Sequence, residues 1–192
     1  MIKAPKLYLK RKDIPIQSLY DMRDEEAVEV QAGTYHTKTK SSEINHEFRS
    51  TTLKKVSPED YPDINKILLN MINVWDGTKD PNDYFVGEYN YLKYGKDDHF
   101  IKHRDFIGVS KNGGRVYSTS TIIHKSDDLK GGRFIMYDDN NFPHHVELDI
   151  GETVFFSSHT NHMIEKVIEG EREVLVAWIY KKEGWQHINN SL

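Results

Sequence analysis

Residues 153–181 decide the fold class, and they read TVFFSSHTNHMIEKVIEGEREVLVAWIYK. Near the end of this stretch two apolar sets alternate, Val174, Val176 and Trp178 with Leu175, Ala177 and Ile179. Successive side chains of a strand point to opposite faces, so a strand here is apolar on both faces. A strand of this kind is typically buried between two layers of a protein.

Further β-rich runs fill the chain from residue 84 onward, with turn-forming residues between them. The predicted strands are Tyr84–Tyr94, His99–Phe106, Arg115–Lys125, Arg133–Asp138, His145–Leu148, Thr153–Ser157 and Glu173–Lys181. Glycine or asparagine pairs separate several of them, at Gly113-Gly114, Gly131-Gly132 and Asn140-Asn141. This succession predicts an antiparallel sandwich or a distorted barrel.

The region before residue 81 predicts a helical layer. A helix start is indicated by Ser57-Pro58-Glu59-Asp60, with a serine cap, a proline in the first turn and an acidic third position. Apolar residues then recur at helical spacing, at Ile64, Ile67, Leu68, Met71 and Ile72. We expect this helix to end at Asp76-Gly77. Upstream, the sequence predicts a short strand at Val28–Val30 and a polar loop over Thr34–Glu47.

The length of 192 residues suits one domain with a substantial core. We predict three parts. Residues 1–80 form an N-terminal region that packs on the core and does not fold independently, residues 81–182 form the core, and residues 183–192 form a tail. The fold class expected is therefore mainly β with an N-terminal helical layer, an α+β arrangement.

Composition excludes several classes of protein. The chain has no cysteine, which rules out a disulfide framework, a cysteine zinc site and a thiol nucleophile. Its net charge of -4 and the lack of a basic stripe predict no nucleic-acid partner. No apolar run is long enough to cross a membrane. Residues 1–5 lack a signal-peptide pattern and residues 189–192 are no retention signal, so we expect a cytoplasmic location.

Three residues are candidate metal ligands: His103, Asp105 and His162. With 10 histidines in the chain, chance alone supplies about one His-x-Asp pair, so the setting of the pair matters. Residues two apart on a strand share a face, and the predicted strand 153–157 ends shortly before His162. Two histidines and one carboxylate are the facial triad of non-haem Fe(II) sites.

Other readings of these residues stay open. His103 and Asp105 could form a surface ion pair, and His162 could be an ordinary loop histidine. His159 is a rival third ligand. A metal could also be held by the polar pair His144/His145, or by His99 and His103 if they lay on a helix.

Several motifs in order resemble the prolyl-4-hydroxylase-type 2-oxoglutarate/Fe(II) dioxygenases. They are Tyr94-Gly95, His103-x-Asp105, Gly131-Gly132, His162, Val167, Gly170-x-Arg172 and Trp178. The resemblance covers about residues 84–181 well. It covers the N-terminal third loosely, where Arg49-Ser50-Thr51 and the helix near residues 60–75 match an Arg-Ser segment and a helix of the family.

The resemblance implies a double-stranded β-helix core of the jelly-roll or cupin-like kind, with iron at one open end. It implies that His103, Asp105 and His162 are the catalytic iron ligands. Arg172 would bind the distal carboxylate of 2-oxoglutarate, for which its planar guanidinium is suited. Tyr94 would contact the same cosubstrate, and Asn90 matches a polar inward position with a weaker correspondence.

The sequence departs from the family pattern at several positions, and these departures indicate which branches of the family it resembles. Phe100 stands where a tyrosine is frequent, so one hydroxyl is lost. Arg172 replaces the lysine that is usual in collagen-type enzymes. Trp178 stands where the nucleic-acid demethylase branch carries a second arginine. Asp105 keeps the carboxylate that related halogenases replace with a small residue.

The implied function is hydroxylation of a C–H bond with Fe(II), 2-oxoglutarate and O₂, releasing succinate and CO₂. The substrate expected by resemblance is a prolyl residue of a peptide or protein. Alternatives are a free amino acid, a small metabolite or a nucleic acid, or a non-catalytic jelly-roll binding module. A need for ascorbate and the oligomeric state stay open. Thr34–Thr52 and Asp76–Asp83 are candidate lid segments.

Overall fold

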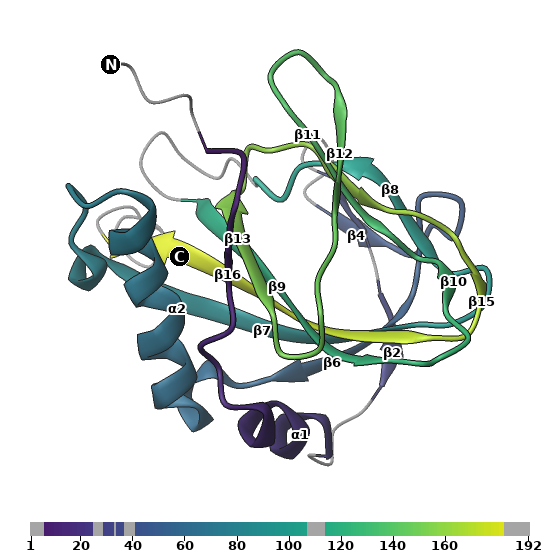
Figure 1. Ribbon diagram of the computed structural model, residues 1–192, viewed down its shortest axis with the longest axis horizontal. Coiled ribbons are helices and arrows are strands. Elements are labelled where there is room, and N and C mark those ends of the chain that lie inside the picture. The colour runs from purple at the N-terminus through teal and green to yellow at the C-terminus, as the bar shows by residue number, and fades with distance from the viewer. Residues whose placement is uncertain (1–5, 25–28, 33, 37–40, 107–113, 183–192) are drawn as a thin grey trace.

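A computed structural model describes residues 6–24, 29–32, 34–36, 41–106 and 114–182 of the chain (Figure 1). Strands dominate the described part, and the helices α1 (Ile16–Asp24), η1 (Pro58–Asp60), α2 (Pro62–Trp75) and η2 (Pro81–Asp83) all precede residue 84. The structure thus confirms a mainly β chain with an N-terminal helical layer. Among the described residues, no helix has the length and apolar character needed to span a membrane.

The larger sheet has seven strands, and every neighbouring pair in it is antiparallel. In spatial order they are β1 (Leu9–Arg11), β13 (Thr153–Ser157), β9 (Arg115–Lys125), β16 (Arg172–Lys181), β7 (Tyr84–Tyr94), β6 (Thr52–Val56) and β2 (Val30–Gln31). The strand predicted to be apolar on both faces is β16, which lies at the centre of this sheet. Its neighbours are β7 and β9 over almost its whole length.

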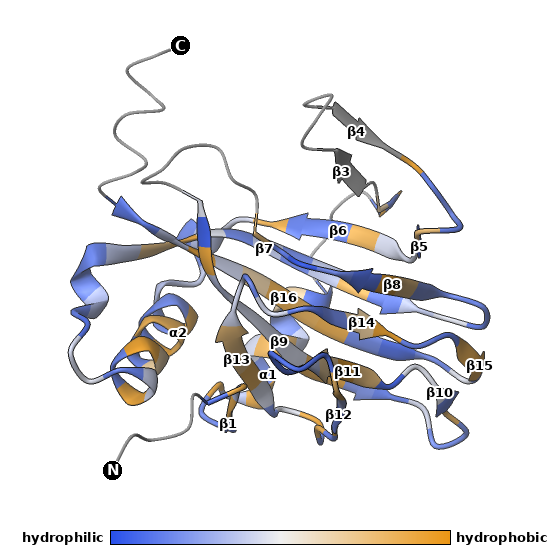
Figure 2. Cartoon of the chain, turned by 90° about the horizontal axis from the view of Figure 1, so that it is seen from above, coloured by the Kyte–Doolittle hydropathy of each residue, from blue (hydrophilic) through white to orange (hydrophobic). Residues whose placement is uncertain are grey.

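The smaller sheet faces the larger one (Figures 1 and 2). Its five strands are, in order, β12 (Pro143–Val146), β11 (Phe134–Tyr137), β14 (His162–Ile164), β8 (His99–His103) and β5 (Arg49–Ser50). Two short pairs complete the sheets, β10 (Lys130–Gly131) with β15 (Val167–Glu169) and β3 (Thr34–His36) with β4 (Ser41–Glu43). Figure 1 shows the two main sheets converging toward β10 and β15.

Two apolar cores lie on the two faces of the larger sheet. The inner core fills the space between the sheets, with Leu92, Phe134, Met136, Phe156, Ile164 and Val174 among its buried members. The outer core joins the larger sheet to the helices α1 (Ile16–Asp24) and α2 (Pro62–Trp75), through Leu19, Met22, Ile64, Leu68, Tyr89 and Ile179. The helical layer therefore backs the sheet and leaves its inner face to the site.

The helix α2 begins later than the sequence predicted. Ser57 caps a separate 3₁₀ turn, η1 (Pro58–Asp60), and its hydroxyl accepts a hydrogen bond from the Glu59 N–H. Tyr61 then takes a non-helical conformation, with φ −128° and ψ 58°, before α2 starts at Pro62. A residue before proline disfavours the α conformation, which explains the break. The predicted end at Asp76 is correct.

Other predicted bounds also need correction. The expected loop Thr34–Glu47 contains the hairpin of β3 and β4, whose polar sequence gives no strand signal. Of the expected strand Val28–Val30, Val28 lies outside the described residues and Val30 begins β2. The strand expected to run from His99 to Phe106 ends at His103, and the one expected at His145–Leu148 lies at Pro143–Val146. A second 3₁₀ turn, η2 (Pro81–Asp83), precedes β7.

Candidate metal centre

The three predicted ligands meet at one point of the smaller sheet. His103 is the last residue of β8, His162 is the first of β14, and the two are direct partners in the antiparallel register. Asp105 follows two residues after β8. One ligand atom from each residue lies within 4.8 Å of the other two. Within the described residues this is the one group of three histidine or acidic side chains close enough to share a metal ion.

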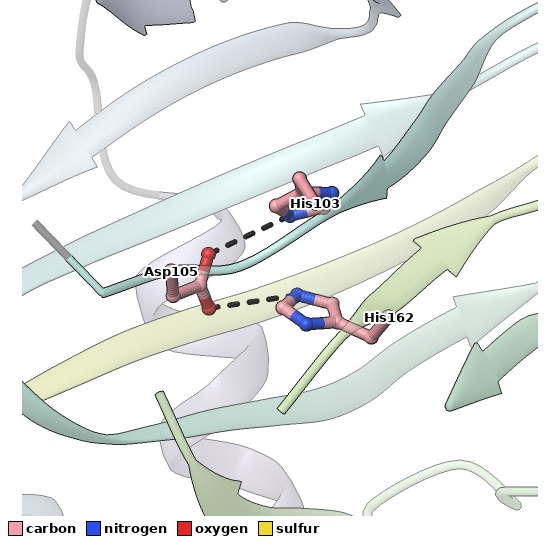
Figure 3. A group of neighbouring side chains, drawn as sticks. All are labelled: His103, Asp105 and His162. Carbon is pink, nitrogen blue, oxygen red and sulfur yellow. Dashed lines mark ion pairs between the residues drawn. The ribbon is translucent and has the colours of Figure 1, made fainter. Parts of the chain in front are cut away.

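Figure 3 shows the carboxylate of Asp105 beside the two imidazoles, with one oxygen directed at each ring. Its Oδ1 lies 3.6 Å from Nε2 of His103, and its Oδ2 lies 3.6 Å from Nε2 of His162. The two rings are 4.2 Å apart between centroids. Two imidazole nitrogens and one carboxylate oxygen therefore converge, which is the donor set of a facial triad.

Backbone carbonyls orient both histidines in the same way. Nδ1 of His103 lies 2.7 Å from the carbonyl oxygen of Ile101, and Nδ1 of His162 lies 3.0 Å from that of Thr160. Each Nδ1–H donates to a carbonyl two residues earlier, so Nε2 is left as the unprotonated nitrogen. This arrangement fixes the tautomer that a metal requires.

A β-bulge in β8 directs the side chain of His103 toward the other two triad residues. On β14 the step from His162 to Ile164 is two residues, while on β8 the paired step from His103 to Phe100 is three. The extra residue turns Phe100 and His103 to the same side, where their rings stack at 3.5 Å. We expected His103 and Asp105 to share one strand face. That reason is wrong because β8 ends at His103, yet the two side chains still converge.

Burial and charge keep His162 and Asp105 in the protonation states that bind metal. Burial lowers the pKa of His162 to about 4, and the neighbouring His103 acts in the same direction. Burial alone would raise the pKa of Asp105, but His162 and His103 together hold it below its ordinary value. At neutral pH the site therefore offers a neutral imidazole at His162 and an ionised carboxylate.

Arg172 is a buried cation without full hydrogen bonding. It is the first residue of β16, is 3% exposed, and pairs with Tyr94 of β7 in the sheet register. Its Nη1 donates to the carbonyl of Gly132, while Nε and Nη2 have no partner among the described residues. Burial lowers its pKa to about 10, so it is still charged at neutral pH. A carboxylate is the ligand that such a group fits.

Two cavities lie along the inner core. The triad and Tyr94 line a narrow one of about 40 Å³, together with Leu92, Phe100, Phe156, Ile164, Val174 and Val176. Arg172 lines a larger one of about 490 Å³ near β12. Phe134 lines both, and its ring is 5.6 Å from that of His162 between centroids. A ligand that reached from the triad to Arg172 would pass this ring.

The other candidate histidines lie outside the triad. His159 is exposed and stacks on Phe106 at 3.9 Å. His144 pairs with Asp138 at 2.9 Å, and His145 beside it is exposed on β12. His99 lies on a strand, so the helical pairing with His103 does not occur; its ring contacts the carbonyls of Asp97 and Glu47. The structure groups none of them into a second cluster of three within its described part.

Sequence reasoning missed a cation beside the narrow cavity. The guanidinium carbon of Arg115 lies 3.5 Å from the ring centroid of Trp178, a cavity residue, and Arg115 also pairs with Glu88 at 3.4 Å. The only sequence signal was its place at the start of a predicted strand. Asn90 and Trp178 are buried, and Asn90 Nδ2 and Trp178 Nε1 find no hydrogen-bond partner in the described part of the chain.

Comparison with known proteins agrees with this geometry. Residues 89–180 match the family model of the 2OG-Fe(II) oxygenase superfamily, and this range contains the triad and Arg172. No curated protein matches the sequence. A viral collagen prolyl hydroxylase from Paramecium Bursaria Chlorella virus-1, solved as a 2OG complex, is similar in fold. It is 15% identical with a TM-score of 0.66, over 92% of this chain and 97% of that chain.

Two further solved structures share the fold. A Pseudomonas putida prolyl-4-hydroxylase is 16% identical with a TM-score of 0.60, over 92% of this chain and 93% of that chain. A Trichoplax adhaerens prolyl hydroxylase, in complex with a hypoxia inducible factor oxygen degradation domain peptide fragment, is 14% identical with a TM-score of 0.57, over 88% and 76%. The likeness confirms the predicted double-stranded β-helix core. Residues 89–180 thus match the 2OG-Fe(II) oxygenase superfamily, whose members use Fe(II), 2-oxoglutarate and O₂.

Proposed function

We propose that this protein hydroxylates a C–H bond of a prolyl residue in a peptide or protein, with Fe(II) and 2-oxoglutarate. The observation that carries the proposal is the triad of His103, Asp105 and His162 in one fold with the buried, underbonded guanidinium of Arg172. One group suits a metal and the other suits the far carboxylate of a 2-oxo acid.

The triad residues would hold the metal from one side. The Nε2 atoms of both histidines face the Asp105 carboxylate, and each opposite Nδ1–H donates to a carbonyl that keeps the ring in place. When bound, Fe(II) and 2-oxoglutarate supply the oxidative decarboxylation that yields succinate and CO₂ and the oxidation of the substrate C–H bond. The chain's contribution is to present three ligands with little reorganisation and to leave the other side open.

Arg172 and Tyr94 would bind the cosubstrate away from the metal. The guanidinium carbon of Arg172 lies 6.0 Å from the ring centroid of Tyr94, at the end of neighbouring strands. Arg172 would donate from Nε and Nη2 to the distal carboxylate, and the Tyr94 hydroxyl would donate to the same group. Burial raises the pKa of Tyr94, so the hydroxyl keeps its proton.

The prolyl substrate rests on similarity of fold. The viral, bacterial and Trichoplax structures are prolyl hydroxylases by name, and the last holds a peptide fragment. Trp178 and Arg115 lie beside the narrow cavity and would contact whatever residue is presented to the metal.

Turnover of 2-oxoglutarate tests the chemistry. We expect succinate release from the Fe(II)-loaded parent protein and none above background from His103→Ala, Asp105→Ala or His162→Ala. His144→Ala is the matched control, because His144 is an exposed histidine of the same sheet that pairs with Asp138. Full turnover in all three triad variants would disprove the iron assignment.

A substrate screen tests the prolyl assignment separately. Proline-containing peptides, free proline, other free amino acids and single-stranded oligonucleotides are each incubated with the loaded protein. Mass spectrometry should find a gain of one oxygen on a prolyl residue of a peptide. Oxygen gain on a free amino acid or a nucleotide alone would leave the chemistry standing and overturn the substrate.

A further inference from the structure

Asp105 is the member of the triad that no strand holds. His103 and His162 are paired with each other across β8 and β14, but β8 ends before Asp105. Asp105 is nonetheless only 8% exposed, and one oxygen of its carboxylate faces each of the two rings. Something other than sheet pairing must keep it there.

Three contacts join residues 104–106 to the turn at residues 157–161, which leads into β14. The Phe106 N–H donates to the carbonyl of Ser158 at 2.9 Å. The Phe106 ring stacks on His159 with centroids 3.9 Å apart and an interplanar angle of 25°. On the other side of Asp105, Nε of Arg104 donates to Oδ1 of Asn161 at 3.2 Å. The contacts thus flank Asp105 on both sides.

The turn is itself fixed to both sheets. Ser158 is fully buried; its N–H donates to the carbonyl of Val116, and its hydroxyl is 2.9 Å from that of Ser118 on β9. The carbonyl of Asn161 accepts a hydrogen bond from the Tyr137 N–H on β11 at 2.9 Å. The same turn supplies the Thr160 carbonyl that orients His162. One rigid turn therefore serves two of the three ligands.

We propose that the 157–161 turn positions Asp105 against His162, with Asn161 as a positioning residue acting through Arg104. The inference rests on the proposed metal site, and it adds residues outside that site. Groups that orient ligands without touching the metal ordinarily affect its affinity by about 10- to 100-fold. Here the bond acts on the neighbour of a ligand, so we expect a smaller change, about three- to tenfold.

Because Arg104 is charged, the two possible roles of this residue predict opposite changes in metal affinity when it is replaced. If Arg104 acted only as a nearby cation, its removal would relieve repulsion and tighten the binding of a divalent ion. If it acts by positioning, Arg104→Ala and Asn161→Ala both weaken binding, although the second changes no charge. Arg104→Gln places a donor nitrogen the same number of bonds from the backbone as Nε, so it should bind metal at least as tightly as the parent.

The measurement is the Kd for Mn(II), followed by the EPR signal of the free ion, with the unfolding midpoint of each metal-free variant showing that it is folded. We expect a Kd raised about three- to tenfold in both alanine variants, no further loss in the double variant, and rescue in Arg104→Gln. Arg133→Ala, which breaks an exposed pair with Glu165 in the same sheet, is the control with unchanged Kd.

The outcomes separate the two proposals. Parent-like or tighter binding by both alanine variants overturns the positioning role while leaving the metal site intact. Losses that simply add in the double variant also overturn it, because two partners of one bond must share a single effect. A parent protein that binds no Mn(II) overturns the metal site, and the inference falls with it.

Discussion

Arg172 brings a full charge into the core between the sheets, and two of its nitrogens find no acceptor there in the described part. Leaving a buried charge uncompensated is costly, on the order of a few kcal/mol. The fold should therefore be more stable with an anion bound at Arg172 than without one. An anion that reaches Arg172 stabilises the fold by the same interaction that gives it affinity.

For this reason Arg172→Ala should raise the apparent KM for 2-oxoglutarate by about one to three orders of magnitude. Arg172→Met should raise it equally while filling more of the space. In the absence of 2-oxoglutarate, the methionine variant should unfold at no lower temperature than the parent, because it also removes the buried charge. An unchanged KM in both variants would remove Arg172 from cosubstrate binding.

His162 makes the metal-free protein sensitive to acid. Its folded pKa of about 4 lies below the ordinary value of 6.5, so on acidification the unfolded chain takes up the proton first. The free energy of unfolding should fall between pH 6.5 and about 4, by at most about 1.4 kcal/mol per pH unit. The lowered pKa of Asp105 adds a further loss below the ordinary range of a carboxyl group.

Urea unfolding of the metal-free protein at several pH values measures this slope. His162→Gln should show a shallower fall between pH 6.5 and 4 than the parent. Equal pH dependence in the parent and His162→Gln would contradict the assignment.

Among the elements, the short pair of β10 and β15 depends on a glycine. Gly131 has φ +73°, and a Cβ there would lie 2.2 Å from the backbone carbonyl oxygen of Lys166. A side chain at position 131 would therefore clash with backbone atoms, which cannot move aside as a flexible side chain could. It would also have to adopt a positive φ, which residues other than glycine rarely do. The pair closes the end of the sandwich where Gly132 accepts a hydrogen bond from Arg172.

We therefore expect Gly131→Ala to lower the free energy of unfolding by about 2 kcal/mol or more. Gly77→Ala is the control, since the nearest atom to a Cβ there is 3.8 Å away, and its effect should be small. Chemical denaturation of both variants decides the point. Equal stability of the two would show that this turn tolerates a side chain.

The predictable strands were those with a run of β-forming residues between turn-forming residues. β7, β9 and β13 have the predicted bounds for this reason. β5, β10 and β15 have two or three residues and owe their existence to a partner strand, so no local pattern marks them. α1 buries only Leu19 and Met22, too few for a helical period, and it is fixed instead by Lys54, whose Nζ donates to the carbonyls of Met22 and Arg23.

Some features of the site could likewise be predicted from the sequence, and others could not. The residue types of the triad and Arg172 could be read from their order in the sequence. The bulge that turns His103 inward and the turn that holds Asp105 could not, because both depend on pairing between segments about 60 residues apart. Residues beside the cavity such as Arg115 carry no motif, so only the fold brings them close to the site.

At the scale of the whole molecule, residues before 81 complete the larger sheet. β6 pairs along half of β7, and α1 and α2 cover the outer face of the sheet. We predict that residues 81–182 expressed alone fail to fold cooperatively, since the outer core would face water. Circular dichroism and a thermal unfolding scan test this. A sharp transition in the shortened chain would show an independent core.

The ligand set also has a consequence for handling the protein. The metal site offers two imidazole nitrogens and a carboxylate oxygen, and the chain has no cysteine. These ligand types do not by themselves select iron over other divalent transition metals. By the ordinary order of divalent affinities, Ni(II) and Cu(II) should outcompete Fe(II) at equal concentration. Protein recovered from an immobilised-nickel resin should therefore be partly blocked. Chelation followed by Fe(II) reloading should raise its activity, whereas direct addition of Fe(II) should do so only slowly.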